Sequence, residues 1–484
     1  MDRHVRVTII GTGFAGLGMA CELKRRGIDD FVVFERAGEV GGTWRDNTYP
    51  GCACDIRSDL YSFSFAPNPD WTSHYAQQPE IEAYLRRTAD EFKVQPHIRF
   101  GHEVEHARWD GIVQRWQIRT SRGDYTADAL VAGAGPLILP KWPTIPGLAT
   151  FPGPRFHSAH WDHDAKLAGQ RVAVIGTGAS AIQFIPHLQR TAAQVTVFQR
   201  TAPWILPRGD RLTSSRRRNL FRRFPPLQRA ARQTQFRVNE LRYLPLVHER
   251  IGRRVEALAL SYLERKVPDA QLRAKLTPHF RLGCKRILIS DDYYPAVTQP
   301  NVEVVTEAIT AVSGDAVITA DNRRRQFDVL IGATGFNATE PPVARVIHGR
   351  DGRSLAEHWA PHLEALHGTT VAGFPNFFML VGPNTALGHN SIVYMIEAQI
   401  RYVVQALDLI AADGVALEPH AAVQRAYSDS LQETLADSVW VRGGCTSFYL
   451  DASGRNSTLW PHRAARFRRT LRRFDPADYQ VVAG

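Results

Sequence analysis

The sequence contains little cysteine and no long apolar run. Five of its 484 residues are cysteine, and Cys52 and Cys54 form a C-x-C pair, which lacks the spacing of a redox pair or a zinc site. We therefore expect five reduced thiols and no metal site. No stretch reaches the roughly 18 uncharged apolar residues that a membrane span needs. Because the first predicted strand begins close to Met1, we also expect no signal peptide and a cytoplasmic location.

Acidic residues are fewer than basic ones, and the chain carries a net charge of +11. Much of the excess lies between Arg208 and Arg254, in runs such as 216–218 and 222–223. The stretch has neither an aromatic stacking platform nor a nucleic-acid motif, so we expect no nucleic-acid partner. A solvated helical face is the simplest interpretation, and attraction of an anionic cofactor or of a membrane surface is the alternative.

Two glycine-rich segments each follow a short apolar run. Residues 7–10 lead into G-T-G-F-A-G at 11–16, and residues 172–175 lead into G-T-G-A-S-A at 176–181. Each pattern predicts a buried strand, a tight turn and the start of a helix, where small residues let a pyrophosphate approach the backbone. Free N–H groups at the positive end of the helix would bind that pyrophosphate. We therefore expect two dinucleotide sites.

The residue at the end of the next strand distinguishes the two sites. Strands are predicted at 31–34 and 195–198, and Glu35 and Arg200 each lie 24 positions after the first glycine of their turn. An acid at this position accepts hydrogen bonds from free ribose hydroxyls, whereas an arginine suits a 2′-phosphate. The first site is thus predicted to take a dinucleotide with an unphosphorylated ribose, and the second to take NADP(H).

The pattern of elements predicts an α/β fold with two Rossmann-like dinucleotide-binding domains and a helical insertion in the second. Further strands are predicted at 128–135, 302–305, 328–335 and 377–382, and a long amphipathic helix at 391–409. Prolines between 140 and 152 indicate a linker. We expect the first domain to comprise residues 1–150 and 335–484. The second is predicted to comprise 151–205, including the linker, and 286–334, with the insertion at 206–285.

A twelve-residue motif lies between the two glycine turns. Residues 151–162 read F-P-G-P-R-F-H-S-A-H-W-D. They resemble the F-x-G-x-x-x-H-x-x-x-W-(P/D) signature of type I Baeyer–Villiger monooxygenases, flavoproteins that convert ketones to esters or lactones. The related flavin-containing monooxygenases, which oxidise amines and sulfides, usually end this motif in Tyr-Lys. Trp161-Asp162 therefore favours the ketone-oxidising branch.

The resemblance extends over nearly the whole chain. Ala53 stands where arginine is frequent in the family, and His462 stands where glycine is common. The first departure removes one possible cofactor contact and leaves the chemistry unaffected. The segments that are similar to the family's are 41–44, 49–51, 54–55, 61–65, 283–286, 382–384, 398–399, 454–457 and 459–461.

The resemblance implies FAD in the first domain, NADP(H) in the second, and a small ketone and O2 as substrates. In the implied cycle NADPH reduces FAD, O2 adds to the reduced flavin, and a peroxyflavin attacks the ketone. Arg286 matches the family's catalytic arginine, which stays protonated and stabilises an anionic adduct. Asp55 matches the carboxylate that pairs with it. Lys285 would join Arg200 and Thr201 at the 2′-phosphate.

The candidate site residues form three groups: FAD contacts, NADP contacts and residues that act on conformation. For Trp44 and Tyr61 the alternative to a flavin contact is ordinary core packing, and for Asp55 the alternative to pairing with Arg286 is the capping of a turn. The implied FAD contacts are Gly11, Gly13, Phe14, Ala15, Gly16, Glu35, Gly42, Thr43, Trp44, Asp55, Tyr61, Val104 and Asn384. The implied NADP contacts are Gly176, Thr177, Gly178, Ala179, Ser180, Ala181, Gln183, Arg200, Thr201, Lys285 and Arg286. Gly153, His157 and Trp161 are expected to act on conformation, and His157 not as an acid or base.

Three other functions compete with ketone oxygenation. N- or S-oxygenation would use the same fold and cofactors and depend less on Arg286. A flavin or disulfide reductase would carry a C-x-x-C or C-x-x-x-x-C pair, which the sequence lacks. A cofactor-holding scaffold or membrane-surface module would use the basic stretch at 208–254. The sequence leaves linear, cyclic, aromatic and steroid ketones open, as well as the oligomeric state; the segments 61–67, 387–394 and 440–449 are the candidates for the pocket lining.

Overall fold

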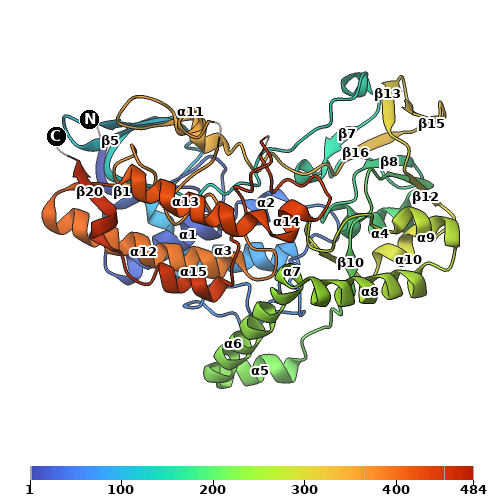
Figure 1. Cartoon of the computed structure of the whole chain (residues 1–484), viewed down its shortest axis with the longest axis horizontal. Helices are drawn as coiled ribbons and strands as arrows, with labels where there is room; N and C mark the ends of the chain where they lie inside the picture. Colours follow the sequence, from blue (N-terminus) through green and yellow to red (C-terminus); the bar gives the residue numbers. More distant parts are fainter. Residues whose placement is uncertain (1–2, 361, 452, 483–484) are drawn as a thin grey trace.

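Each of the two glycine turns follows a strand of a different sheet, the first sheet mixed and the second parallel, and the two sheets form the cores of two lobes (Figure 1). The computed structural model describes residues 3–360, 362–451 and 453–482. Both described chain ends lie in the first lobe.

The first sheet has the strand order β17-β4-β5-β6-β1-β2-β3, with β18 also paired to β6. In β1 the apolar side chains of Val7 and Ile9 are buried, and all five residues of β2 are buried, as expected for strands covered on both faces. Helices α1 (Phe14–Arg25) and α12 (Ile392–Asp413) pack against each other beside this sheet. The strands are β1 (Arg3–Ile10), β2 (Phe31–Glu35), β3 (Ile98–Phe100), β4 (Val104–Asp110), β5 (Arg115–Thr120), β6 (Gly123–Ala132), β17 (Ile347–His348) and β18 (Phe377–Met379).

The second sheet is parallel throughout, in the order β12-β9-β8-β16-β7. Helix α4 packs against α10 and β9, and a small antiparallel sheet of β13, β14 and β15 extends the same lobe. The elements are β7 (Arg155–His157), β8 (Arg171–Ile175), α4 (Ala181–Thr191), β9 (Gln194–Phe198), α10 (Tyr293–Val297), β12 (Val302–Val305), β13 (Ile309–Ser313), β14 (Ala316–Thr319), β15 (Arg324–Gln326) and β16 (Val329–Gly332).

The stretch between β9 and β12 is predominantly helical, and α5 and α6 project from the body as a hairpin (Figure 1). Two short strands, β10 (Ile205–Leu206) and β11 (Leu288–Ile289), pair in parallel where the chain leaves and re-enters the lobe. The helices are α5 (Ser215–Arg223), α6 (Pro225–Leu241), α7 (Leu244–Val247), α8 (Glu249–Lys266) and α9 (Ala270–Leu276).

After β16 the chain returns to the first lobe. The long helix predicted at 391–409 is confirmed as α12 (Ile392–Asp413), which continues to Gly414, where a left-handed backbone ends it. The strand predicted at 377–382 stops at Met379, because Val381 adopts a positive φ of 63°. The remaining elements are α1 (Phe14–Arg25), α2 (Thr43–Asp46), α3 (Gln78–Glu91), α11 (Leu355–His358), β19 (Ala416–Pro419), α13 (Ala421–Ala436), α14 (Val439–Arg442), α15 (Ala464–Thr470) and β20 (Tyr479–Val482). None of the described helices combines the length and apolarity needed to cross a bilayer.

Candidate functional site

The first glycine turn brings helix α1 directly onto the end of β1. Gly11 has a φ of +93°, and a Cβ on Gly16 would lie 1.9 Å from the Gly11 carbonyl oxygen. Gly13 is the N-cap of α1, and within the described residues no side chain caps its first N–H groups. Phe14 and Ala15 begin the helix. The turn therefore presents unpaired donors of the kind that bind a pyrophosphate.

Glu35 ends β2 beside this turn, and its carboxylate is buried. Its Oε2 accepts hydrogen bonds from Thr12 N (3.0 Å) and Thr12 Oγ1 (2.7 Å), and its Oε1 accepts one from Ala37 N (2.9 Å). Thr12, the residue between the first two glycines of the turn, thus holds the carboxylate that ends β2. Sequence reasoning missed this role, although the position inside the G-x-G pattern marks it.

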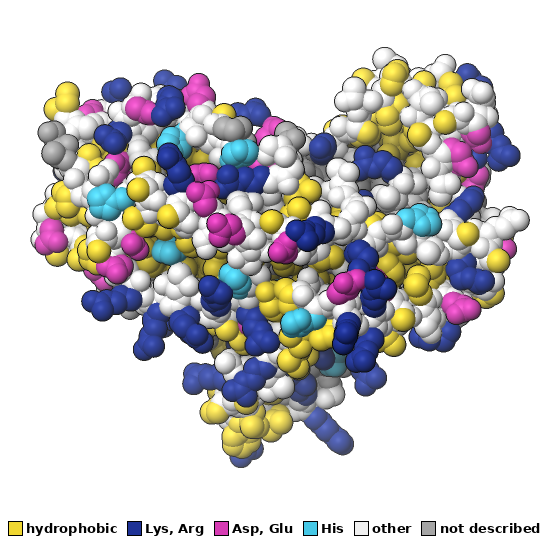
Figure 2. All heavy atoms as spheres, in the orientation of Figure 1, with side chains coloured by type: hydrophobic (Ala, Val, Ile, Leu, Met, Phe, Trp, Pro, Cys, Tyr) yellow, Lys and Arg dark blue, Asp and Glu magenta, His cyan; other side chains and the backbone are white. Residues whose placement is uncertain are grey.

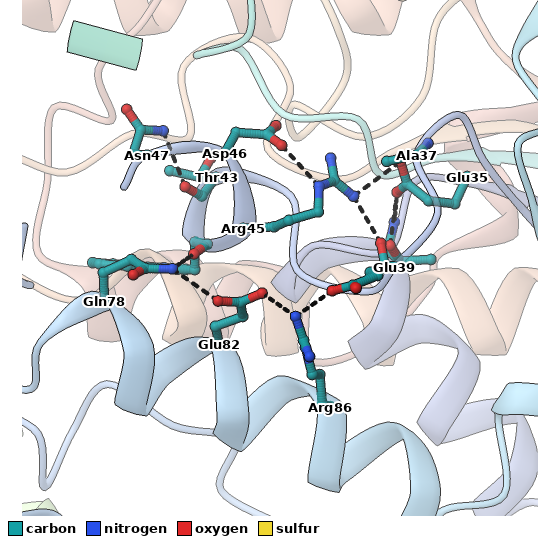
Figure 3. Close-up of polar contacts among 12 residues, drawn as sticks. Glu35, Ala37, Glu39, Thr43, Arg45, Asp46, Asn47, Gln78, Glu82 and Arg86 are labelled. Carbon is teal, nitrogen blue, oxygen red and sulfur yellow. Dashed lines mark hydrogen bonds and ion pairs between the residues drawn. The ribbon is translucent and has the colours of Figure 1, made fainter. Parts of the chain in front are cut away.

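Arg45 forms an ion-pair network next to Glu35 (Figure 3). Its guanidinium lies 3.2 Å from Glu35 Oε1 and 2.8 Å from Asp46 Oδ1, and Arg86 bridges Glu39 and Glu82 in the same view. A cavity of about 410 Å³ opens here, with Arg36, Asn47, Glu103 and His160 among its lining residues. Val104, a predicted FAD contact, follows Glu103 as the first residue of β4. Sequence reasoning missed Arg45.

The aromatic residues assigned to the flavin lie together beside the first residue of α1. Trp44 Nε1 donates to Tyr61 Oη (3.1 Å), and the Tyr61 ring lies 5.0 Å from that of Phe14. Gly42 (φ +55°) and Thr43 lead into α2, and a Cβ on Gly42 would lie 3.0 Å from the Gly13 Cα. Burial raises the pKa of the Tyr61 hydroxyl well above its usual value, so Tyr61 stays neutral.

The side chain of Asn384, another predicted FAD contact, is engaged by the C-terminal segment. Its Nδ2 donates to the carbonyl oxygens of Asn456 (2.8 Å) and Leu459 (3.0 Å), both in the C-terminal segment. Its backbone is left-handed, with a φ of 54°. The structure therefore uses the Asn384 side chain to join two loops of the first lobe.

The second glycine turn repeats the first in a more open form. Gly176 has a φ of +110°, and within the described residues a Cβ on Gly178 would meet nothing within 4 Å. Ala179 and Ser180 precede α4, which starts at Ala181 without a side-chain cap from any described residue. Thr177 Oγ1 donates to the Thr201 carbonyl oxygen (3.3 Å). The turn and the end of β9 are thus held together.

Two cations, Arg200 and Lys285, lie beside Thr201 just after the end of β9. Lys285 Nζ donates to Thr201 Oγ1 at 2.9 Å, and burial together with the Arg200 charge lowers the pKa of Lys285. In the part of the chain that the structure describes, neither Arg200 nor Lys285 forms an ion pair. Two cations without a carboxylate partner make a site suited to an anion such as a 2′-phosphate.

Gln183, also predicted to contact NADP, links the two lobes. Its Oε1 accepts a hydrogen bond from Tyr49 Oη (3.0 Å), and its Nε2 donates to the Ala53 carbonyl oxygen (3.0 Å). Gln183 lies in the first turn of α4, whereas Tyr49 and Ala53 belong to the segment between α2 and α3. This contact ties the second dinucleotide turn to the segment that carries Asp55.

Arg286 and Asp55 form an ion pair between the lobes. Arg286 Nε donates to Asp55 Oδ2 at 2.8 Å and Nη2 to the same oxygen at 2.5 Å. The side chains remain 36% and 27% exposed, so the pair is accessible to a bound molecule. The Asp55 carboxylate raises the pKa of the Arg286 guanidinium above its already high value. Arg286 is therefore a permanent cation held by one carboxylate oxygen.

The residue that follows Arg286 in the chain joins an apolar cluster. Ile287 packs against a cluster that contains Leu246 of α7, Trp440 of α14 and Tyr449. Burial raises the pKa of the Tyr449 hydroxyl, and the Arg286 charge opposes that shift, so the two side chains are close. Sequence reasoning gave Tyr449 only as part of a candidate pocket segment, since nothing local indicates that it approaches a residue 163 positions away.

Cys284 forms a disulfide with Cys445, which contradicts the expectation of five reduced thiols. The two residues are 161 positions apart, and the sequence carries no sign that Gly443, where a Cβ would lie 2.6 Å from Cys284 Cβ, allows the close approach. Cys21, Cys52 and Cys54 are free and buried. The bridge fastens the segment of Lys285 and Arg286 to the loop before Tyr449.

Gly153, His157 and Trp161 lie at the edge of the second sheet, not in a cofactor turn. β7, which contains His157, pairs with β16, and a Cβ on Gly153 would lie 2.3 Å from the Asp328 carbonyl oxygen. His157 Nδ1 accepts a hydrogen bond from Ala159 N (3.1 Å), and burial lowers the pKa of its ring to about 4. Trp161 packs on Phe184 of α4. The motif therefore packs the chain between the lobes against the second sheet.

Comparison with known proteins agrees with this architecture. A sequence profile described as pyridine nucleotide-disulphide oxidoreductase matches residues 8–215. A Baeyer-Villiger monooxygenase of Streptomyces coelicolor is 51% identical over the whole chain and 93% of its own length. Cyclohexanone monooxygenase from Rhodococcus sp. Phi1 bound to NADP+ superposes with a TM-score of 0.90 at 26% identity, covering both chains fully. OTEMO in complex with FAD and NADP gives 0.88 at 25% identity over 99% of each chain.

The fold class predicted from the sequence is thus confirmed, as is the resemblance on which the functional prediction rests. Both glycine turns, the uncapped helix starts and the Arg286–Asp55 pair occur in a chain that matches these relatives from end to end. The chain belongs to the Baeyer–Villiger monooxygenase family.

Proposed function

We propose that this chain is an NADPH- and O2-dependent flavoprotein monooxygenase that inserts an oxygen atom next to a ketone carbonyl, giving an ester or lactone. The observation that carries the proposal is the Arg286–Asp55 ion pair, which lies between the two lobes and beside an apolar cluster. We infer FAD for the first turn and NADP(H) for the second. The OTEMO structure is a complex with FAD and NADP, and the cyclohexanone monooxygenase structure is bound to NADP+.

The residues of both turns fit these cofactors. The uncapped helix starts would hold the two pyrophosphates, and Glu35 would meet the adenosine ribose of FAD. Arg200, Thr201 and Lys285 would bind the 2′-phosphate that distinguishes NADPH from NADH. When bound, NADPH supplies the hydride and FAD the chemistry that activates O2.

Arg286 would act through its charge and not by proton transfer. Since Asp55 raises the pKa of its guanidinium, the group keeps its proton at any working pH and offers a fixed cation to the carbonyl oxygen as negative charge develops there. Asp55 would orient the guanidinium by accepting from Nε and Nη2. Leu246, Trp440 and Tyr449 would exclude water from the same region. We also propose a cytoplasmic location, where NADPH is available.

Replacement of Arg286 tests the proposal. In Arg286→Ala, rapid-mixing spectroscopy is expected to show flavin reduction by NADPH within about threefold of the parent, while ester formation falls by at least about 100-fold. Arg281→Ala is the matched control, because Arg281 pairs with Glu256 outside the site. A ketone and a thioether are supplied in parallel. Full ketone turnover in Arg286→Ala, or oxygenation of the thioether alone by the parent, would contradict ketone oxygenation.

A further inference from the structure

The net charge of the chain is concentrated in one projecting element. Residues 208–254 contain fourteen arginines, no lysine and three acidic residues, so this stretch alone accounts for the +11 of the whole chain. Between residues 211 and 239 there are nine arginines and no acidic residue. This segment comprises α5 and most of α6, the hairpin that projects from the body (Figure 1).

The end of the hairpin is apolar and exposed. Leu220, Phe224 and Leu227 are 44%, 48% and 46% exposed, and Pro225 and Pro226 lie exposed between them in the turn from α5 to α6. We call these five residues the apolar tip. Figure 2 shows hydrophobic side chains at the projecting end of the molecule, with lysine and arginine side chains on either side. Contiguous exposed apolar patches rimmed by polar residues are typical of interaction surfaces.

The opposite face of the hairpin is fixed to the body, so the tip is held outward. Phe221 is buried, and Gln228 Nε2 donates to the Asn68 carbonyl oxygen at 2.7 Å. Arg217 pairs with Asp59 at 2.7 Å and Arg222 with Asp70 at 2.6 Å. The body thus uses some of the arginines as anchors, while the apolar tip stays exposed at the end of the hairpin.

The remaining arginines face solvent next to the tip. Arg216, Arg223 and Arg229 are exposed, and within the described residues they form no ion pair. Arg216 and Arg223 belong to α5 and Arg229 to α6, so both helices that carry the apolar tip also carry free charge, which suits a broad anionic plane with an apolar interior. A nucleic acid offers the charge without an apolar layer, and the tip has one aromatic ring, too few for a stacking platform.

We propose that the α5–α6 hairpin docks the protein on an anionic phospholipid bilayer, with the apolar tip among the acyl chains near the headgroups and Arg216, Arg223 and Arg229 against the lipid phosphates. Interfacial binding of this kind combines a buried apolar area with attraction to anionic lipid, and it requires no membrane-spanning helix. The inference goes beyond the proposed function and does not depend on it.

Vesicle sedimentation of the full chain tests the proposal. Binding is expected to vesicles of phosphatidylcholine with about 30% phosphatidylglycerol, to be at least tenfold weaker to phosphatidylcholine alone, and to weaken in high salt. The double variants Phe224→Ser/Leu227→Ser and Arg223→Gln/Arg229→Gln should each lower the partition coefficient by about tenfold. Neither pair lies in the candidate site, so thermal melting serves as the check of folding.

Matched control variants test whether the position of the changed residues matters and not only their type. Ile112→Ser/Val113→Ser changes two exposed apolar residues (91% and 55%) in the β4–β5 turn, and Arg119→Gln/Arg324→Gln removes two exposed charges elsewhere. Both should bind anionic vesicles like the parent. The proposal is overturned if the controls lose as much affinity as the tip variants, or if neutral and anionic vesicles bind equally. The proposal is also overturned if no vesicle binds and the tip binds a second copy of the chain or duplex DNA instead.

Discussion

Lys285 and Arg286 are consecutive in the chain, yet their side chains contact different lobes of the molecule. Lys285 Nζ donates to Thr201 Oγ1 at the end of β9, whereas Arg286 donates to Asp55 Oδ2 in the segment between α2 and α3. One dipeptide therefore joins the proposed 2′-phosphate site to the proposed oxygen-transfer site. Substitution of Lys285 should therefore affect selection of the cofactor, whereas substitution of Arg286 or Asp55 should affect oxygenation.

Replacing Asp55 by asparagine tests the positioning of Arg286. The amide keeps the shape and loses the charge that holds both Nε and Nη2, so the guanidinium is less well oriented. We expect the rate of ester formation to fall by about 100-fold, with flavin reduction by NADPH changed by less than about threefold. Stopped-flow absorbance and product analysis measure the two rates. Asp59→Asn, which removes a comparable pair with Arg217, should leave both unchanged.

Replacing Lys285 or Arg200 by alanine tests the choice of nicotinamide cofactor. Each change removes a cation that has no ion-pair partner among the described residues, so its loss should be felt mainly by a bound 2′-phosphate. We expect KM for NADPH to rise by about 10- to 100-fold, while KM for NADH stays within about twofold. Arg190→Ala, at the far end of α4, is the control. Equal increases for NADH and NADPH would rule out phosphate recognition.

The sequence indicated those parts of the site that depend on local pattern. The two strand–turn–helix units and Glu35 and Arg200 at the ends of the next strands are set by neighbours along the chain, and the structure has them there. The pairing of Arg286 with Asp55, by contrast, came from family resemblance, because 231 residues separate the two. Roles that depend on folded proximity were missed, as with Thr12 and Arg45 around Glu35.

The disulfide is a further long-range contact that the sequence alone did not predict. Counting and spacing of cysteines gave five free thiols, and only the approach of two distant loops brings Cys284 to Cys445. Gln183 is similar, since its predicted role in the second turn says nothing of the hydrogen bonds it makes to Tyr49 and Ala53 in the first lobe. Long-range contacts of this kind leave no periodic signal in a single sequence.

Thiol labelling tests the Cys284–Cys445 bridge. Burial raises the pKa of Cys21 to about 12 and that of Cys52 to about 11, so these thiols should not react with iodoacetamide in the native protein. We expect three labels after denaturation and five after denaturation with reductant, counted by mass spectrometry. Five labels without reductant would exclude the bridge.

Loss of the bridge should also lower stability. Cys445→Ser frees a loop closed over 161 positions, and we expect Tm to fall by roughly 5 °C. Dithiothreitol should lower the Tm of the parent by a similar amount and leave that of Cys445→Ser unchanged. A reductant effect of equal size in both proteins would assign it to something other than this disulfide.

His157 should make stability depend on pH. Burial lowers the pKa of its ring from 6.5 to about 4, and in the described residues its Nε2 has no hydrogen-bond partner, so the folded protein holds the ring neutral while the unfolded chain protonates it. The contribution of the neutral ring to the free energy of unfolding is therefore fully present above pH 6.5. It is lost as the pH falls toward 4, by about 3 kcal/mol at most. We expect His157→Gln to be less stable than the parent at pH 7.5 and to lose less stability between pH 6.5 and 4.5, measured by urea unfolding.

His279→Gln, at an exposed position, is the control and should keep the parent's slope of unfolding free energy against pH. An unchanged slope in His157→Gln would mean that the ring is protonated in the folded protein.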